Sequence, residues 1–217
     1  MVRVGVNEQT PVSVRYRTSG VKLSEKEAAV IDRRVRRTRA AIQSALTQLI
    51  LEKGYDAVTV TDIIDRADVG RSTFYAHFTD KSEVFDDTID ELTGFLRAHS
   101  RDSTSIFAFS LPMFEHIVEQ RLVVRALFGN DGHSSAMRAT STALTGVVLD
   151  ELRARFADAE RPQFQLVADF VVGAYFSVVT HWIGGSHRYS AAELDDAFRR
   201  LVVPGVESVL GPSTPTA

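Results

Sequence analysis

Residues 59–81 read TVTDIIDRADVGRSTFYAHFTDK, and their pattern is the most informative in the chain. Thr59 and Asp62 stand three residues apart, which is the spacing of a helix N-cap signature. The apolar residues that follow recur at helical intervals: Val60, Ile63, Ile64 and Ala67. Residues 68–70, Asp-Val-Gly, predict the end of this short helix, because Asp and Gly tolerate the backbone angles of a sharp reversal.

A second short helix is expected at residues 71–78, with two faces of opposite character. Phe74 and Phe78 lie on the side that we expect to be buried. The outward side carries hydrogen-bonding groups and no carboxylate: Arg71, Ser72, Thr73, Tyr75 and His77. Donors and dual donor-acceptors of this kind suit phosphates and base edges. The pattern indicates a DNA-binding helix-turn-helix.

At these residues the chain resembles the TetR (TetR/AcrR) family of transcriptional regulators. The resemblance runs from about Arg36 to Leu92 and includes the segments EKGY, TVTDI, TFYAHF and DKSE. Two positions depart from the family pattern, because Asp68 stands where the family usually has glycine and Gly70 where it usually has serine. We therefore expect the turn to be kept and the polar cap of the second helix to be lost.

The resemblance implies roles for individual side chains at the DNA. Four match positions that usually touch phosphates: Thr59, Tyr75, His77 and Lys81. Three match positions that face base edges: Arg71, Ser72 and Thr73. Thr61 could do either. Tyr75 is expected to face DNA, because Phe74 and Phe78 already occupy the buried side.

Arg39 belongs to a dense run of arginines in a long helix expected at residues 33–53. The run comprises Arg33, Arg34, Arg36, Arg37 and Arg39. Positive side chains packed this closely repel one another unless something anionic screens them, so beside a helix-turn-helix we favour contact with the DNA backbone. The alternative is an ordinary solvated charged face.

Composition and charge distribution agree with a cytoplasmic DNA-binding protein. Residues 1–81 carry 14 Lys and Arg against 10 Asp and Glu, whereas residues 82–217 carry 11 against 18. The chain has no cysteine, and its N-terminus lacks the apolar segment of a signal peptide. The most apolar run, residues 170–185, is expected to be a buried helix too short to span a bilayer, so we expect no membrane partner.

Patterns typical of catalysis and metal binding are missing from the sequence. It contains no GxSxG, HExxH, P-loop or dinucleotide fingerprint. Glu115, His116 and Asp196 are isolated polar groups of the kind usually found on surfaces or satisfied in cores. Three further histidines match no metal-ligand spacing: His133, His181 and His187. We expect no enzyme activity, no metal and no cofactor.

Helical periodicity continues to the end of the chain, so the predicted fold class is all-α. The expected later helices are residues 80–99, 112–128, 134–156, 163–183 and a last one from residue 190 to just before residues 204–205. We expect a flexible basic N-terminal arm at residues 1–30 and a three-helix DNA-binding domain with a linking helix at residues 31–99. An effector-binding and dimerisation domain at residues 100–210 and a disordered tail at residues 211–217 complete this division.

The resemblance implies an effector pocket and a dimer interface in the later helices. Aromatic bulk and one histidine suggest pocket residues: Phe114, Phe128, Tyr175, Phe176, His181 and Trp182. Plain core packing of the same side chains is equally open. The expected effector is small and apolar, of drug size. Small residues on the helix at residues 163–183 suggest a homodimer contact: Gly173, Ala174 and Ser177.

The predicted function is therefore that of a homodimeric transcriptional regulator. It would bind a near-palindromic double-stranded DNA operator as a repressor and be released by the effector. Two alternatives are a helical small-molecule-binding protein that has lost DNA binding, for which Asp68 and Gly70 are the support, and an enzyme on a helical scaffold.

Overall fold

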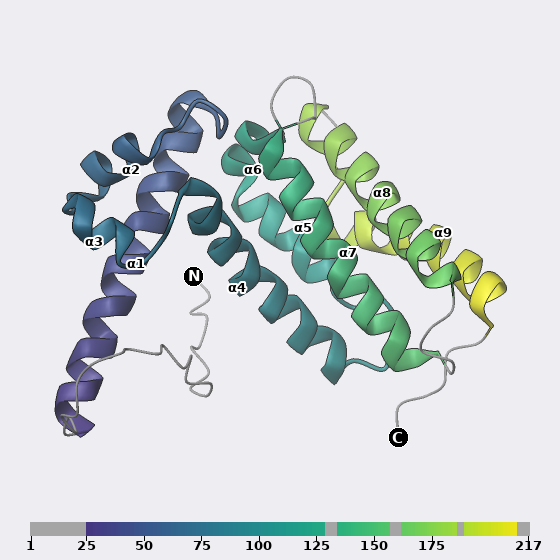
Figure 1. Cartoon of the computed structure of the whole chain (residues 1–217). Helices are drawn as coiled ribbons and strands as arrows, with labels where there is room; N and C mark the ends of the chain where they lie inside the picture. The colour runs from purple at the N-terminus through teal and green to yellow at the C-terminus, as the bar shows by residue number, and fades with distance from the viewer. Residues whose placement is uncertain (1–24, 129–133, 157–161, 186–188, 212–217) are drawn as a thin grey trace. The chain divides into compact units, whose positions relative to one another are not determined.

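The computed structural model describes residues 25–128, 134–156, 162–185 and 189–211, which are helical apart from short connections (Figure 1). The helices are α1 (Glu25–Lys53), α2 (Val60–Ala67), α3 (Arg71–Tyr75), α4 (Lys81–Asp102), α5 (Ser110–Glu119), α6 (Arg121–Phe128), α7 (Ser135–Arg155), α8 (Gln163–Gly184) and α9 (Ala191–Leu210). No strand occurs in these ranges, which confirms the all-α fold class. Among the described residues, those up to Arg37 form one unit and those from Thr38 onward a second.

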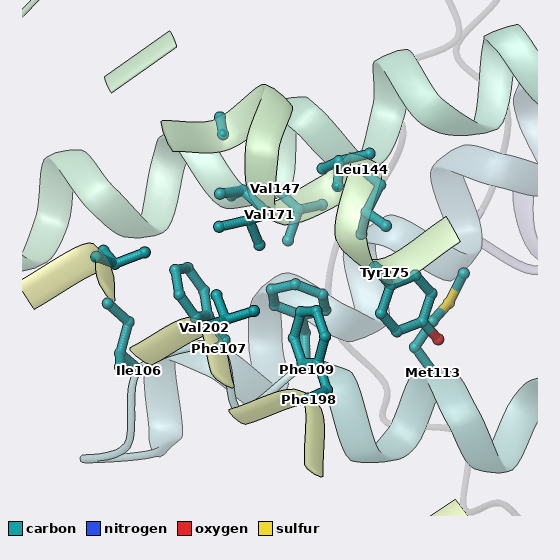
Figure 2. Close-up of a cluster of buried hydrophobic side chains, with 14 of the residues drawn as sticks. Ile106, Phe107, Phe109, Met113, Leu144, Val147, Val171, Tyr175, Phe198 and Val202 are labelled. Carbon is teal, nitrogen blue, oxygen red and sulfur yellow. The ribbon is translucent and has the colours of Figure 1, made fainter. Parts of the chain in front are cut away.

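The second unit contains two clusters of buried apolar side chains. We call the first the helix-turn-helix core; it comprises Ile42, Ala45, Leu46, Leu49, Ile50, Tyr55, Val58, Ile63, Ile64, Phe74, Phe78, Val84, Phe85, Ile89 and Ala136. We call the second the aromatic core, after its rings Phe107, Phe109, Phe114, Phe156, Phe164, Tyr175, Phe176 and Phe198. It joins the loop after α4 with α5, α7, α8 and α9, whose labelled side chains point toward one another in Figure 2.

The single helix predicted at residues 112–128 is wrong, because the chain breaks at Gln120 into α5 and α6. Gln120 has φ −105° and ψ 23°, and its N–H donates to the carbonyl of His116 at 2.9 Å. α5 packs against α9, whereas α6 packs against α7 and α8. These different packing partners impose a break that no glycine or proline marks in the sequence.

The predicted end of the last helix is also wrong, because α9 continues through Pro204 to Leu210. Proline inside a helix costs about 3 kcal/mol, since it lacks an N–H and clashes with the preceding turn. The carbonyl that Pro204 leaves without a donor belongs to Arg200, which is exposed, so water can satisfy it. Beyond it, Val206 and Leu210 are buried in the aromatic core, which contributes about 1.5–3 kcal/mol each and offsets that cost.

α8 is longer than its apolar run alone suggests. It has 22 residues and, by length and composition only, is the one helix in the described ranges that could cross a membrane. Half of its most apolar window is buried inside the fold, where Val171, Tyr175 and Val179 pack in the aromatic core. The expectation that the apolar run is too short to span a bilayer is therefore wrong by length and composition, and the expected buried helix is buried over only half of its apolar window.

A buried ion pair on α7 fixes the loop between α4 and α5. The side chains of Arg155 and Glu151 are 6% and 4% exposed, and Nε lies 3.0 Å from Oε1. Arg155 also donates to backbone carbonyls within residues 100–105 at 2.7–3.3 Å. Glu151 accepts the N–H of Phe107, whose φ of 56° is strained for an aromatic residue. The pair thus holds a strained loop in place.

We expect Arg155→Met to lower the free energy of unfolding by about 3–5 kcal/mol, because Glu151 would be left buried without its counter-charge. Arg153 is a matched control, since its guanidinium lies 3.8 Å from Asp150 and both side chains are half exposed. Arg153→Met should cost at most about 1 kcal/mol. Urea unfolding of both variants measures the difference, and equal losses would contradict this role for the buried pair.

Candidate nucleic-acid interface

α2 begins at Thr59, and the predicted N-cap is confirmed. The N–H of Asp62 donates to Thr59 Oγ1 at 3.2 Å, and the N–H of Thr59 donates back to Asp62 Oδ2 at 2.7 Å. The ammonium of Lys53, 2.7 Å from the same carboxylate, and then Thr59 hold the pKa of Asp62 well below its usual range. Thr59 Oγ1 also donates to Asp62 Oδ2 at 2.6 Å, so its hydroxyl is engaged in the cap, whereas the exposed Thr61 has no such contact in the described part of the chain.

The backbone conformation of the turn after α2 explains why Asp68 and Gly70, which depart from the family pattern, are tolerated there. Asp68 has φ 51° and ψ 49°, a left-handed conformation that glycine adopts freely and that aspartate tolerates. Gly70 has φ −69° and ψ 149°, which any residue can adopt, and α3 begins there without a side-chain cap. The expectations that the turn is kept and the polar cap lost are both confirmed.

α3 separates a buried side from an outward side as predicted. Phe74 and Phe78 are 0% and 1% exposed and belong to the helix-turn-helix core. α3 ends at Tyr75, earlier than expected, and a turn continues to Phe78, whose N–H donates to the carbonyl of Phe74 at 2.9 Å. The exposed side chains of α3 are Arg71, Ser72, Thr73 and Tyr75. They form a polar surface without a carboxylate.

Lys81 is bound within the fold. Its ammonium donates to the carbonyl oxygens of Tyr55, Asp56 and Val58 at 2.9, 3.1 and 2.9 Å. It also lies 4.6 Å from the centre of the Tyr55 ring, as in a cation–π contact. An ammonium has three N–H donors, so a phosphate contact would require Lys81 to release a carbonyl.

Arg39 is likewise held by neighbouring residues. Its Nη2 lies 2.5 Å from Asp87 Oδ1, its Nη1 donates to the carbonyl of His77 at 3.3 Å, and its guanidinium lies 4.4 Å from the ring centre of Phe78. Burial lowers the pKa of the His77 imidazole, and the positive charge of Arg39 lowers it further. Arg39 therefore ties α1 to the end of the helix-turn-helix, and His77 is neutral at pH 7.

The predicted pocket residues fall into different environments. Phe114, Tyr175 and Phe176 are buried in the aromatic core, and the Tyr175 hydroxyl has no hydrogen-bond partner among the described residues. Trp182 is half buried and donates through Nε1 to the carbonyl of Tyr189 at 3.2 Å, and His181 is exposed. Phe128 ends α6, and its side chain lies outside the described part of the chain.

An apolar cavity of about 220 Å³ lies elsewhere, and Phe176 is the predicted pocket residue that lines it. Its other lining residues come from α1 and α4–α7: Leu46, Thr47, Ile50, Phe85, Thr88, Ile89, Leu92, Met113, His116, Ile117, Gln120, Val123, Val124, Leu127, Met137 and Thr140. The sequence holds one signal for it, since His116 and Gln120 share the helical face of Met113 and Ile117.

The predicted dimer residues are not all on one side of α8. Gly173 and Ser177 are exposed, whereas Ala174 is partly buried against the aromatic core. Leu166 and Phe170 precede Gly173 on the same exposed stripe and are 69% and 60% exposed. α9, which packs beside α8, exposes Leu201 and Val209 at 78% and 58%. Each of these apolar side chains is largely uncovered in the single chain.

Two family models match the chain. "Bacterial regulatory proteins, tetR family" matches residues 42–88, and "Transcriptional regulator C-terminal region" matches residues 104–203. The HTH-type transcriptional regulator YxbF of Bacillus subtilis is 38% identical over 82 residues, which are 37% of this chain and 22% of that protein. The matches to curated relatives span between 22% and 60% of those proteins.

Solved structures share the fold over most of their length. A TetR transcriptional regulator from Streptococcus agalactiae superposes with a TM-score of 0.61 at 23% identity, over 81% of this chain and 98% of that chain. NalD of Pseudomonas aeruginosa, the secondary repressor of the MexAB-OprM multidrug efflux pump, gives 0.56 at 15% identity, over 79% and 96%. The solved structures show the shared fold, and the two family models show that the chain belongs to the TetR family of DNA-binding transcriptional regulators.

Proposed function

We propose that the protein is a cytoplasmic homodimer that represses transcription from a near-palindromic operator and is released by a small apolar effector. The observation that carries the proposal is the exposed, carboxylate-free surface of α3 above the buried rings of Phe74 and Phe78. Such a helix presents base-reading side chains to the major groove from a fixed position.

The side chains divide into readers and positioning residues. Arg71, Ser72 and Thr73 face base edges, because they are exposed at the start of α3. Thr59, Tyr75 and His77 contact phosphates. Thr61 contacts either a phosphate or a base edge. Arg39 and Lys81 hold the helix-turn-helix together, since their charged groups already bind Asp87 and backbone carbonyls.

Two copies are needed to read the two halves of an operator. Recognition helices in neighbouring major grooves lie about 34–36 Å apart, one helical turn of DNA. The exposure of Leu166, Phe170, Gly173 and Leu201 on α8 and α9 supports a contact with a second copy. Self-complementary packing of these two helices from each chain would form a four-helix interface.

We expect Arg71→Ala to weaken operator binding by about 1–3 kcal/mol and to relax the base preference at one position in each half-site. The operator is first selected from random double-stranded DNA with the wild-type protein, and the selection is then repeated with the variant. Arg125→Ala is the control, because Arg125 is exposed on α6 and carries the same charge. An unchanged base profile for Arg71→Ala would remove Arg71 from the readers.

Lys81→Met distinguishes a positioning role from a phosphate contact. The variant keeps an apolar stem over Tyr55 but loses three charged hydrogen bonds, so the free energy of unfolding should fall by at least about 1.5–3 kcal/mol, the value of one such bond. Operator binding should weaken for all sequences while the slope of affinity against salt stays unchanged. A slope reduced by about one unit at unchanged stability would instead show that Lys81 neutralises a phosphate.

Gly173→Leu tests the dimer. A Cβ atom at Gly173 meets nothing within 4 Å, so the single chain accommodates the change, while a close helix crossing would be overpacked by about 1–3 kcal/mol in each copy. Sedimentation should show monomer at micromolar concentration, and operator affinity should fall. Gly94→Leu is the matched control, because Gly94 is an exposed and equally open position on α4. A fully dimeric Gly173→Leu protein would place the interface elsewhere.

A further inference from the structure

The apolar cavity lies between the two cores. One wall consists of helix-turn-helix core residues on α1 and α4: Leu46, Ile50, Phe85 and Ile89. The facing wall consists of aromatic-core residues on α5 and α8: Met113, Ile117 and Phe176. A molecule in the cavity would therefore touch both cores at once, including the one that supports α3.

The volume of the cavity limits the size of an occupant. It measures about 220 Å³. An engineered apolar cavity of about 150 Å³ binds benzene, whereas sites for drug-sized molecules occupy about 300–1,000 Å³. The cavity thus suits a bicyclic ring system or a compact branched hydrocarbon, which is smaller than the drug-sized effector expected from the sequence.

The lining excludes ionised molecules. No Lys, Arg, Asp or Glu lines this cavity in the described part of the chain. Its threonine hydroxyls donate to backbone carbonyls one turn earlier: Thr47 to Gln43, Thr88 to Val84 and Thr140 to Ala136. A carboxylate or ammonium group would be buried there without a counter-charge, which is strongly unfavourable.

Two polar side chains, one on α5 and one at its C-terminal end, are available to hydrogen-bond a ligand. His116 and Gln120 line the cavity and make no hydrogen bond through their side chains to another described residue. Gln120 is exposed, whereas His116 is partly buried. Burial lowers the pKa of His116 despite the opposing charge of Glu119, so at pH 7 one imidazole nitrogen donates and the other accepts. His116 is therefore the inner polar anchor of the cavity.

We propose that this cavity binds a compact, uncharged, mainly hydrocarbon molecule with one hydroxyl group, about the size of a naphthol, and that His116 hydrogen-bonds the hydroxyl. The size, the lack of charged lining residues and the single inner polar anchor each restrict the ligand to this class. The class of ligand is inferred from the cavity alone. The effect of the bound ligand on operator affinity rests on the proposed function.

That effect follows from the shared wall. A bound molecule presses on Leu46 and Ile50, and the same core holds Phe74 and Phe78 beneath α3. A ligand that binds better when the two cores are further apart shifts the population toward that arrangement, by no more than its difference in affinity for the two. Operator affinity should then fall as the ligand binds.

The test uses three probes of similar shape on the full chain: 2-naphthol, 2-methylnaphthalene and 2-naphthoate. Calorimetric titration near neutral pH should show 2-naphthol binding about tenfold more tightly than 2-methylnaphthalene, which is the net effect of one hydrogen bond. No binding of 2-naphthoate is expected. In the wild-type protein, equal affinity for 2-naphthol and 2-methylnaphthalene, or tighter binding of 2-naphthoate, would overturn the proposal.

His116→Phe should abolish the tenfold preference by weakening 2-naphthol alone, with 2-methylnaphthalene unchanged. His99→Phe is the matched control, because His99 is exposed on α4 and outside the cavity, and it should keep the preference. A preference that persists in His116→Phe would show that another group binds the hydroxyl.

Fluorescence anisotropy with the selected operator separates the two proposals. In the wild-type protein, saturating 2-naphthol should lower operator affinity several-fold. A protein that shows the hydroxyl preference but binds no DNA would refute the proposed function and leave the ligand assignment standing. A protein that binds its operator but shows no such preference would refute the ligand assignment alone.

Discussion

The structure depends on the burial of Phe74 and Phe78. α3 has five residues and could not persist alone in water, so its position is set by two rings that α1 and α4 enclose. Arg39 lies over one of these rings, and Lys81 fixes the loop that precedes α2. The two cations thus help to place the exposed surface of α3.

The helix-turn-helix is predictable from sequence because its signals are local. The cap at Thr59, the reversal at Asp68 and the two faces of α3 each follow from residues a few positions apart. The break at Gln120 and the continuation through Pro204 are not predictable in this way. Both depend on contacts with residues far away in the sequence. The break occurs because α5 and α6 pack on different helices, and α9 continues because Val206 and Leu210 are buried in the aromatic core.

The roles of charged and aromatic side chains are harder to predict than their positions. A lysine at the position of Lys81 can reach a phosphate or a carbonyl, and only the three-dimensional arrangement shows the carbonyls of Tyr55 and Val58 around it. Aromatic bulk predicts burial, so Phe114 and Tyr175 fill the aromatic core. The cavity forms where two cores fail to fill the space between them, and no local pattern encodes such a mismatch.

That mismatch has an energetic consequence. Apolar side chains that line the cavity of about 220 Å³ lack packing partners on one side, which forfeits part of their dispersion attraction. A ligand of matching shape recovers part of this attraction, and a compression of the two cores would recover another part. Ligand binding favours a wider separation of the two cores, and compression favours a narrower one. Unequal stabilisation of two arrangements of the fold by an occupant is what the proposed release from DNA by an effector would require.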